Sequence, residues 1–325
     1  SLPLRNFQQY MDWISRLEKL NDVIDQYIAL ANQGIENQVM PPKVLMSRVL
    51  NQIKLQNVDS YINSPFYDAF EVLPDEISNQ EQKQIRQQAE TTITNVVIPS
   101  YVKLLTFFEN SYYPNCRDTI GISDIKNGSQ YYELIARQFT TTELTPDEIH
   151  NIGLSEVTRI KNEMFKIMDQ VQWNGSFDEF LDFLRTDSQF YFETGEELFT
   201  EYLATSKRID PLLVKLFKDL PSMPYGLKPI PMESAPDTTT AYYQRPAADG
   251  SRAGYYYVNL YMPEVRPKYE IEALSLHEAM PGHHLQIAYT MELDLPNFRK
   301  YGGYTAFVEG WGLYAESLGL SLIHI

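Results

Sequence analysis

The sequence has one cysteine, few cations and no long apolar run, and each shortage excludes a class of protein. With Cys116 alone, the chain can form neither an internal disulfide nor a metal site built from thiolates. Lys and Arg number 27 against 43 Asp and Glu, and the resulting net charge of −16 disfavours nucleic acid and anionic membranes as partners. No apolar segment is long enough to cross a bilayer. The 43% hydrophobic content instead predicts a protein with a large core.

The two ends of the sequence suggest a fragment of a longer protein. The chain opens without Met in helical sequence that lacks the pattern of a signal peptide, and it stops abruptly after "YAESLG". Residues 320–325, "LSLIHI", match one reading frame of a transposon end used in sequencing libraries. We therefore expect a non-native tail in which His324 has no role. The alternative is a short apolar strand.

The first two hundred residues predict helices with one apolar face. Apolar positions recur at helical spacing from Phe7, and again after Pro41 and Pro42. A third helical segment spans residues 84–109 and contains Pro99, which predicts a kink or a division into two helices.

The stretch "LTPDEIHNIG" predicts a further helix start. Thr145 can cap the helix, Pro146 suits its first turn, and the acidic residues that follow complement the positive end of the helix dipole. His150 lies in this first turn. As a lone histidine, it is interpreted as a surface or packing residue rather than as a metal ligand.

After residue 220 the pattern changes from helix to sheet. A proline-rich segment leads into "TTTAYYQRPAADGSRAGYYYVNLY", in which two β-prone runs flank Asp249 and Gly250. This predicts a hairpin or a long loop with "GYYYVNL" as the return strand. We expect one domain over residues 1–319, with a helical part to about residue 220 and a sheet and metal-site part over about 221–319.

The stretch "LHEAMPGHHLQ" concentrates the residues that carry chemistry. Apolar spacing on both sides indicates helix, interrupted by Pro281 and Gly282. In zinc hydrolases with an HExxH motif, two histidines one turn apart bind the metal and the glutamate acts as general base. Here His277 and Glu278 fit the start of that motif, but Pro281 stands where the second histidine would be. A strict HExxH site is therefore excluded.

An expanded site remains possible if the helix is broken. In an unbroken helix, His283 would point well away from His277, and His284 would lie about 10 Å further along the axis. A break at the Pro-Gly pair can return either histidine to the metal. The alternative interpretation is a kinked core helix with surface histidines.

A third ligand is expected on a second helix. Glu309 in "FVEGWGLYAE" is the candidate, and Glu316 follows two turns later on the same face. The alternative for either glutamate is a solvated helix residue, and for Glu316 this is weighed equally against a residue that supports a ligand.

Four segments together resemble a known family. "LTPDEIHNIGLSEVTRIKNEM", "AYYQRPAADGSRAGYYYVNL", "LHEAMPGHHLQ" and "FVEGWGLYAE" occur in the order and spacing of the bacterial domain-of-unknown-function family 885, many of whose members are labelled lipoproteins. That family is similar to zinc peptidases of the angiotensin-converting-enzyme and thermostable-carboxypeptidase kind. The resemblance implies a mainly α, zincin-like metallopeptidase fold with a small antiparallel sheet at a cleft, and a periplasmic or lipid-anchored location.

The resemblance also implies roles for individual residues. His277, Glu309 and either His283 or His284 would bind one zinc ion, with Glu278 as general base and proton donor. The strand "GYYYVNL" would serve as the edge to which an extended peptide substrate adds, which makes Tyr256, Tyr257 and Asn259 candidate cleft residues. The alternative is that this tyrosine-rich strand packs in the core, as such strands more often do. The family extends past Gly319, so groups that complete the active site are expected beyond this fragment, which could bind metal without being active.

These observations predict hydrolysis of a peptide bond by a metal-activated water. No Ser or Cys stands in a recognisable nucleophile motif. Two alternatives stay open: a zinc hydrolase of a non-peptide amide or ester, and a non-catalytic metal-binding or surface binding module. Oligomeric state, substrate and cleavage position do not follow from the sequence.

Overall fold

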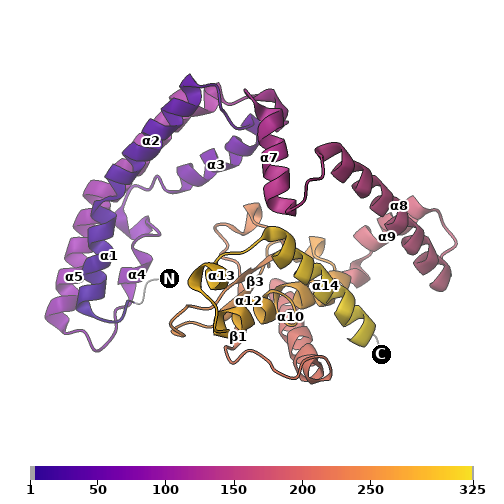
Figure 1. Cartoon of the computed structure of the whole chain (residues 1–325). Helices are drawn as coiled ribbons and strands as arrows, with labels where there is room; N and C mark the ends of the chain where they lie inside the picture. The colour runs from indigo at the N-terminus through magenta and orange to yellow at the C-terminus, as the bar shows by residue number, and fades with distance from the viewer. Residues whose placement is uncertain (1–3, 324–325) are drawn as a thin grey trace. The chain divides into compact units, whose positions relative to one another are not determined.

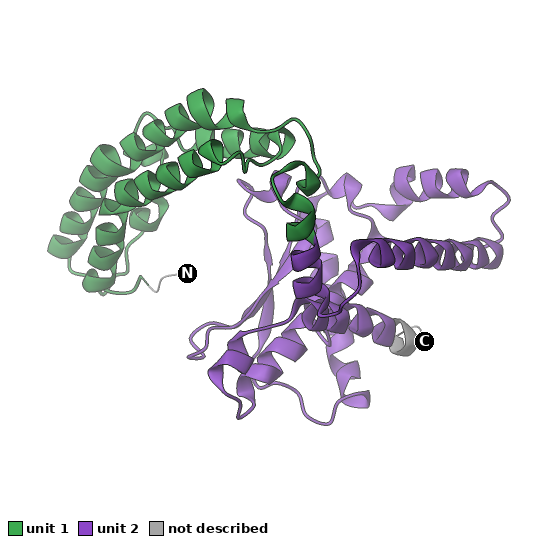
Figure 2. Ribbon diagram, turned by 45° about the horizontal axis from the view of Figure 1, so that its top comes forward, with its two compact units in different colours: residues 1–132 green, residues 133–325 purple. Residues whose placement is uncertain are grey.

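The computed structural model describes residues 4–323 and is mainly helical (Figure 1). By its internal contacts the chain divides into two compact units, Ser1–Tyr132 and Glu133–Ile325 (Figure 2). Residues 1–3 and 324–325 are outside the description, and His324 is among them. The single domain predicted over residues 1–319 stays a prediction, because compactness alone does not show which parts fold together.

The first unit is built from helices. Its α-helices are α1 (Phe7–Glu18), α2 (Leu20–Glu36), α3 (Lys43–Leu55), α4 (Asp68–Glu71), α5 (Asn79–Thr92) and α6 (Ile98–Phe107). Tyr10, Ile14 and Leu17 form the buried stripe of α1, and they pack in one cluster with Ile85 and Ala89 of α5. The helices predicted from Phe7 and after Pro42 are thereby confirmed.

The interruption predicted near Pro99 is also confirmed. α5 ends at Thr92, a π-helical turn covers Ile93–Val97, and Pro99 lies in the first turn of α6. A first-turn position suits proline because the N–H that it lacks is not needed there. The π turn accommodates the change of hydrogen-bond pattern between the two helices.

The second unit surrounds a small sheet with helices. Its helices are α8 (Pro146–Gln170), α9 (Phe177–Thr186), α10 (Gly195–Ile209), α11 (Ile271–Glu278), α12 (His283–Glu292), α13 (Asn297–Tyr301) and α14 (Thr305–Ile323), and α7 (Gly128–Thr140) runs across the unit boundary. Leu320 is therefore helical, and the alternative of a C-terminal strand is wrong for the described residues.

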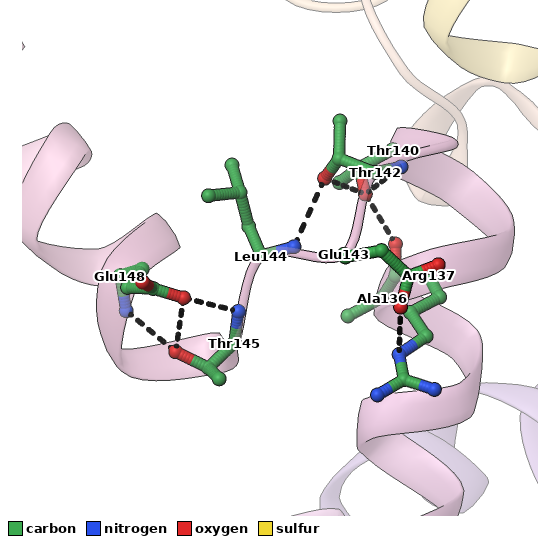
Figure 3. Close-up of polar contacts among 8 residues, drawn as sticks. All are labelled: Ala136, Arg137, Thr140, Thr142, Glu143, Leu144, Thr145 and Glu148. Atoms are coloured by element: carbon green, nitrogen blue, oxygen red, sulfur yellow. Dashed lines mark hydrogen bonds and ion pairs between the residues drawn. The ribbon is translucent and has the colours of Figure 1, made fainter.

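The start of α8 follows the prediction (Figure 3). The Thr145 hydroxyl accepts a hydrogen bond from the backbone N–H of Glu148, and the Glu148 carboxylate accepts one from the N–H of Thr145 at 2.8 Å. This reciprocal capping box lowers the pKa of Glu148, chiefly through the Thr145 backbone hydrogen bond. His150, one turn later, is exposed, as its surface interpretation requires.

The sheet has three strands in the order β1-β3-β2, where β1 is Tyr225–Pro229, β2 is Ala241–Gln244 and β3 is Gly254–Val258. β2 pairs with β3 in the antiparallel sense, whereas β1 pairs with β3 in parallel. The sheet is therefore mixed and not purely antiparallel as predicted. β3 lies in the middle with both backbone edges paired, so it cannot be the edge that accepts a substrate strand; that expectation was wrong.

The sheet and the helices share one core. Tyr256 and Val258 of β3 pack with Leu198 and Tyr202 of α10 and with Ile271 of α11. α11 packs against both α10 and α14. Among the helices of residues 4–323, none is long and apolar enough to cross a membrane.

Candidate metal centre

The Pro-Gly pair separates two helices. α11 ends at Glu278, α12 begins at His283, and the Met280–Pro281 peptide bond between them is cis. The connection folds back on α11 so closely that a Cβ at Gly282 would collide with the backbone carbonyl groups of Leu276 and His277. Only glycine fits at such an approach. The break predicted from the sequence is therefore real, and it returns the chain to the end of α11.

The His277 ring lies between two carboxylates of α14. Its Nε2 is 3.4 Å from Oε2 of Glu309, and its Nδ1 is 2.7 Å from Oε1 of Glu316. The two glutamates are two helical turns apart, and Gly312 lies between them on the same face. A Cβ at Gly312 would stand 2.5 to 2.8 Å from atoms of the imidazole. The absence of a side chain there makes room for the ring.

His283 completes a group of three ligands. Its ring centroid is 4.6 Å from that of His277, the planes are nearly perpendicular, and its Nε2 is 3.8 Å from Oε2 of Glu309. One ligand atom from each of His277, His283 and Glu309 lies within 4.8 Å of the others. Metal-ligand bonds of about 2.1 Å place tetrahedral ligands about 3.4 Å apart. Small side-chain adjustments would therefore bring all three to one zinc ion.

His284 points away from this group. Its Nε2 is 2.9 Å from the carbonyl oxygen of Met223 and its Nδ1 is 2.8 Å from the hydroxyl of Tyr243. Because a carbonyl only accepts, Nε2 carries the hydrogen and Nδ1 accepts from Tyr243. Burial lowers the pKa of His284 to about 4. The ring is neutral with both nitrogens engaged, so the structure favours His283 as the second histidine ligand.

The Glu278 carboxylate lies beside the ligand group and away from solvent. Its residue is 8% exposed, and burial raises its pKa to about 7, with the His277 charge and the backbone N–H of Tyr243 acting in the opposite direction. Tyr243 belongs to β2, so the free edge of this strand faces the end of α11. An ionisable carboxylate of this kind can accept and release a proton near neutral pH.

Glu316 fixes the orientation of His277. A hydrogen bond from Nδ1–H to this carboxylate leaves the Nε2 lone pair facing Glu309 and His283, which is the arrangement that carboxylate–histidine pairs adopt at metal sites. His283 has no corresponding support, since its buried Nδ1 has no hydrogen-bond partner among residues 4–323. Burial lowers the pKa of His283, which keeps the ring in the neutral form that a metal requires.

Two of the predicted cleft residues lie in the interior. Tyr256 is fully buried against Tyr202, and Asn259, 1% exposed, donates its amide hydrogens to the carbonyl oxygens of Ala235, Thr238 and Thr239. Both side chains therefore make structural contacts in the interior, and the expectation that they line a cleft was wrong. Tyr257 is half-buried and stacks on Tyr242 of β2.

Three residues of the site were not singled out from the sequence. They are Gly312, Tyr243 and Trp311, whose indole N–H donates to the carbonyl oxygen of Pro281 at 2.8 Å and joins α14 to the connection. Gly312 had a signal, because it lies three residues after Glu309 and four before Glu316 on one helix face. Tyr243 and Trp311 had none, because only the tertiary fold brings them to the histidines.

Comparison with known proteins identifies a family and structural relatives. Residues 1–322 match the family described as "Bacterial protein of unknown function (DUF885)". The crystal structure described as "the putative lipoprotein from Colwellia psychrerythraea" is 28% identical, with a TM-score of 0.91 over 99% of this chain and 56% of that one. The chain thus spans about half the length of this relative. No curated protein matches the chain.

Proposed function

The chain is a member of the DUF885 family of bacterial proteins of unknown function, and we propose that it is a zinc-dependent hydrolase, in the first place a metallopeptidase. The observation that carries the proposal is the convergence of His277, His283 and Glu309 directly beside the buried Glu278. Two histidines and a carboxylate are a typical ligand set of catalytic zinc, which keeps its fourth position for water.

Each residue has a role in this proposal. When bound, zinc supplies a Lewis acid that lowers the pKa of a water ligand and polarises a carbonyl group. Glu278 accepts a proton from the attacking water and delivers it to the leaving amine. Glu316 holds His277 in the tautomer whose Nε2 is free to bind the metal. The same donor set also suits hydrolysis of a non-peptide amide or ester.

The free edge of β2 supports a peptide as the substrate. β2 is an outer strand of the sheet, and the backbone N–H of Tyr243 on it reaches the Glu278 carboxylate. An extended peptide that adds to this edge would place its backbone next to the general base. The family resemblance favours the same substrate class, and the lipoprotein description of the solved relative favours a cell-envelope location.

The first test measures both the zinc content and the peptide-cleaving activity of the native-length protein. We expect about one zinc per chain by elemental analysis and cleavage of peptides in a mixed library. The substitution Glu278→Gln should lower the rate by two to four orders of magnitude, roughly the contribution of general acid–base catalysis, without loss of zinc. Undiminished turnover would refute the role of Glu278, and a protein that takes up no zinc would favour a non-catalytic binding module.

A further inference from the structure

A second concave site lies beside the metal centre. It is a cavity of about 780 Å³ lined by α12, α13, the following loop and the first turn of α14. Its α12 residues Gln286, Ile287 and Thr290 share one helix face with His283, and Val308 directly precedes Glu309. α12 packs against both α13 and α14 (Figure 1). Two of the three helices that line this cavity, α12 and α14, therefore also hold His283 and Glu309.

The charge of the cavity is opposite to that of the chain. Its lining includes Arg245, Arg299 and Lys300 and, among residues 4–323, no Asp or Glu, although the whole sequence carries a net charge of −16. None of the three cations forms an ion pair within the part of the chain that the structure describes. Arg245 makes one long hydrogen bond of 3.3 Å to the carbonyl oxygen of Tyr301. Three cations thus remain available to an anion.

Part of the remaining lining is apolar. Ile287, Phe298, Phe307 and Val308 form the walls next to the cations. Such a combination suits a carboxylate that is attached to an apolar group, because the cations bind the charge while the walls cover the hydrocarbon. A highly hydrated inorganic anion would gain nothing from these walls.

We propose that this cavity binds a carboxylate of the substrate close to the scissile bond. The proposal rests on the hydrolase function proposed above and adds its substrate class. Arg245 follows β2 directly and stands two residues after Tyr243, a distance of about 7 Å along an extended strand. A peptide lying on the β2 edge beside Glu278 would therefore reach the cations within one or two residues. The carboxylate can come from a C-terminus or from an acidic side chain.

Binding of small probes tests the cavity independently of turnover. We would titrate native-length protein calorimetrically with N-acetyl-alanyl-phenylalanine, with its C-terminal amide, and with N-acetyl-alanyl-glutamic acid α-amide, whose only charge is on the side chain. Each titration is made with and without zinc. At least one carboxylate probe should bind about tenfold more tightly than the uncharged amide, a ratio expected for charge-assisted hydrogen bonds. Tighter binding of the first acid would indicate a C-terminal carboxylate, and tighter binding of the glutamic acid amide would indicate an acidic side chain.

Two double variants, one inside the cavity and one outside it, test whether the carboxylate binds in the cavity. The double substitution Arg299→Gln and Lys300→Gln should weaken binding of the carboxylate probe about tenfold. It should leave the affinity for the uncharged amide unchanged. The exposed pair Lys215→Gln and Lys218→Gln changes the net charge equally outside the cavity and should have no effect. Equal binding of acid and amide, or unchanged binding in the cavity variant, would overturn the proposal. A protein without zinc or turnover would refute the hydrolase function, while the probe titrations would still decide the cavity.

Discussion

Adjacent histidines at the start of α12 have opposite environments. His283 faces Glu309 and His277, whereas His284 is held by Tyr243 and the Met223 carbonyl oxygen. His283→Ala should therefore abolish zinc binding. His284→Ala should retain the metal and lower the free energy of unfolding by about 2 to 4 kcal/mol, because the imidazole is buried and its two half-buried polar partners lose their hydrogen bonds. Elemental analysis and urea denaturation measure the two effects. If His284→Ala lost zinc while His283→Ala kept it, His284 and not His283 would be the second histidine ligand.

The buried Glu278 predicts a pH-dependent stability of the metal-free protein. Its folded-state pKa of about 7 lies above the ordinary value of 4.5, so its contribution to stability is present below pH 4.5 and is lost as the pH rises through 7. In chelator-treated protein, Glu278→Gln should gain stability over the unsubstituted chain by about 3 kcal/mol between pH 4 and pH 8. Thermal unfolding at both pH values checks this, and a pH-independent difference would contradict it.

Some residues of the candidate metal centre can be predicted from the sequence and others cannot. His277, Glu278 and Glu309 follow from residue type and helical spacing, and the structure brings His277 and Glu309 together with His283. The choice between His283 and His284 could not be made, because the partners of His284 lie 41 and 61 residues away in the chain. The two interpretations of Glu316, a residue that supports a ligand or a solvated helix residue, are distinguished only by its contact with Nδ1 of His277.

At the scale of elements, α14 approaches α11 closely at two glycines, Gly312 against the His277 ring and Gly319 against the Leu276 side chain. Gly312→Ala would push the His277 ring out of place, and we expect zinc affinity to fall by about tenfold or more, the range seen when support of a ligand is lost. Gly310 is the matched control on the same helix, since a Cβ there meets nothing within 4 Å. Gly310→Ala should keep the affinity and stabilise the helix by up to about 1 kcal/mol. Competitive titration with a zinc chelator compares the two, and equal affinities would contradict the packing argument.

Helices were easier to predict than the sheet. The capping residues of α8 and the prolines before α3 are local signals, so those helix starts needed no tertiary information. β1 lies in a proline-rich segment that reads as loop, and it is a strand because it pairs in parallel with β3. The central position of β3 also depends on β1, which is why the sequence suggested the wrong edge strand.

At the scale of the whole molecule, zinc should affect the two units differently. All candidate ligands lie in the Glu133–Ile325 unit. Zinc at a hundred times its dissociation constant stabilises the folded state by about 2.7 kcal/mol. Hydrogen exchange in α11, α12 and α14 should therefore slow by up to about a hundredfold on zinc addition, while exchange within residues 4–132 stays unchanged. Mass spectrometry of peptides from each unit measures this, and equal slowing in both would show that the units unfold together.

The short separation of the ligands along the chain has a consequence for folding. Residues 277 and 309 enclose a loop of about 30 residues, whose closure costs only a few kcal/mol of chain entropy. A structural zinc site releases about 10 kcal/mol or more on binding. A bound ion would thus act as a reversible cross-link that closes this loop, and zinc supply during synthesis would control how early α11, α12 and α14 associate.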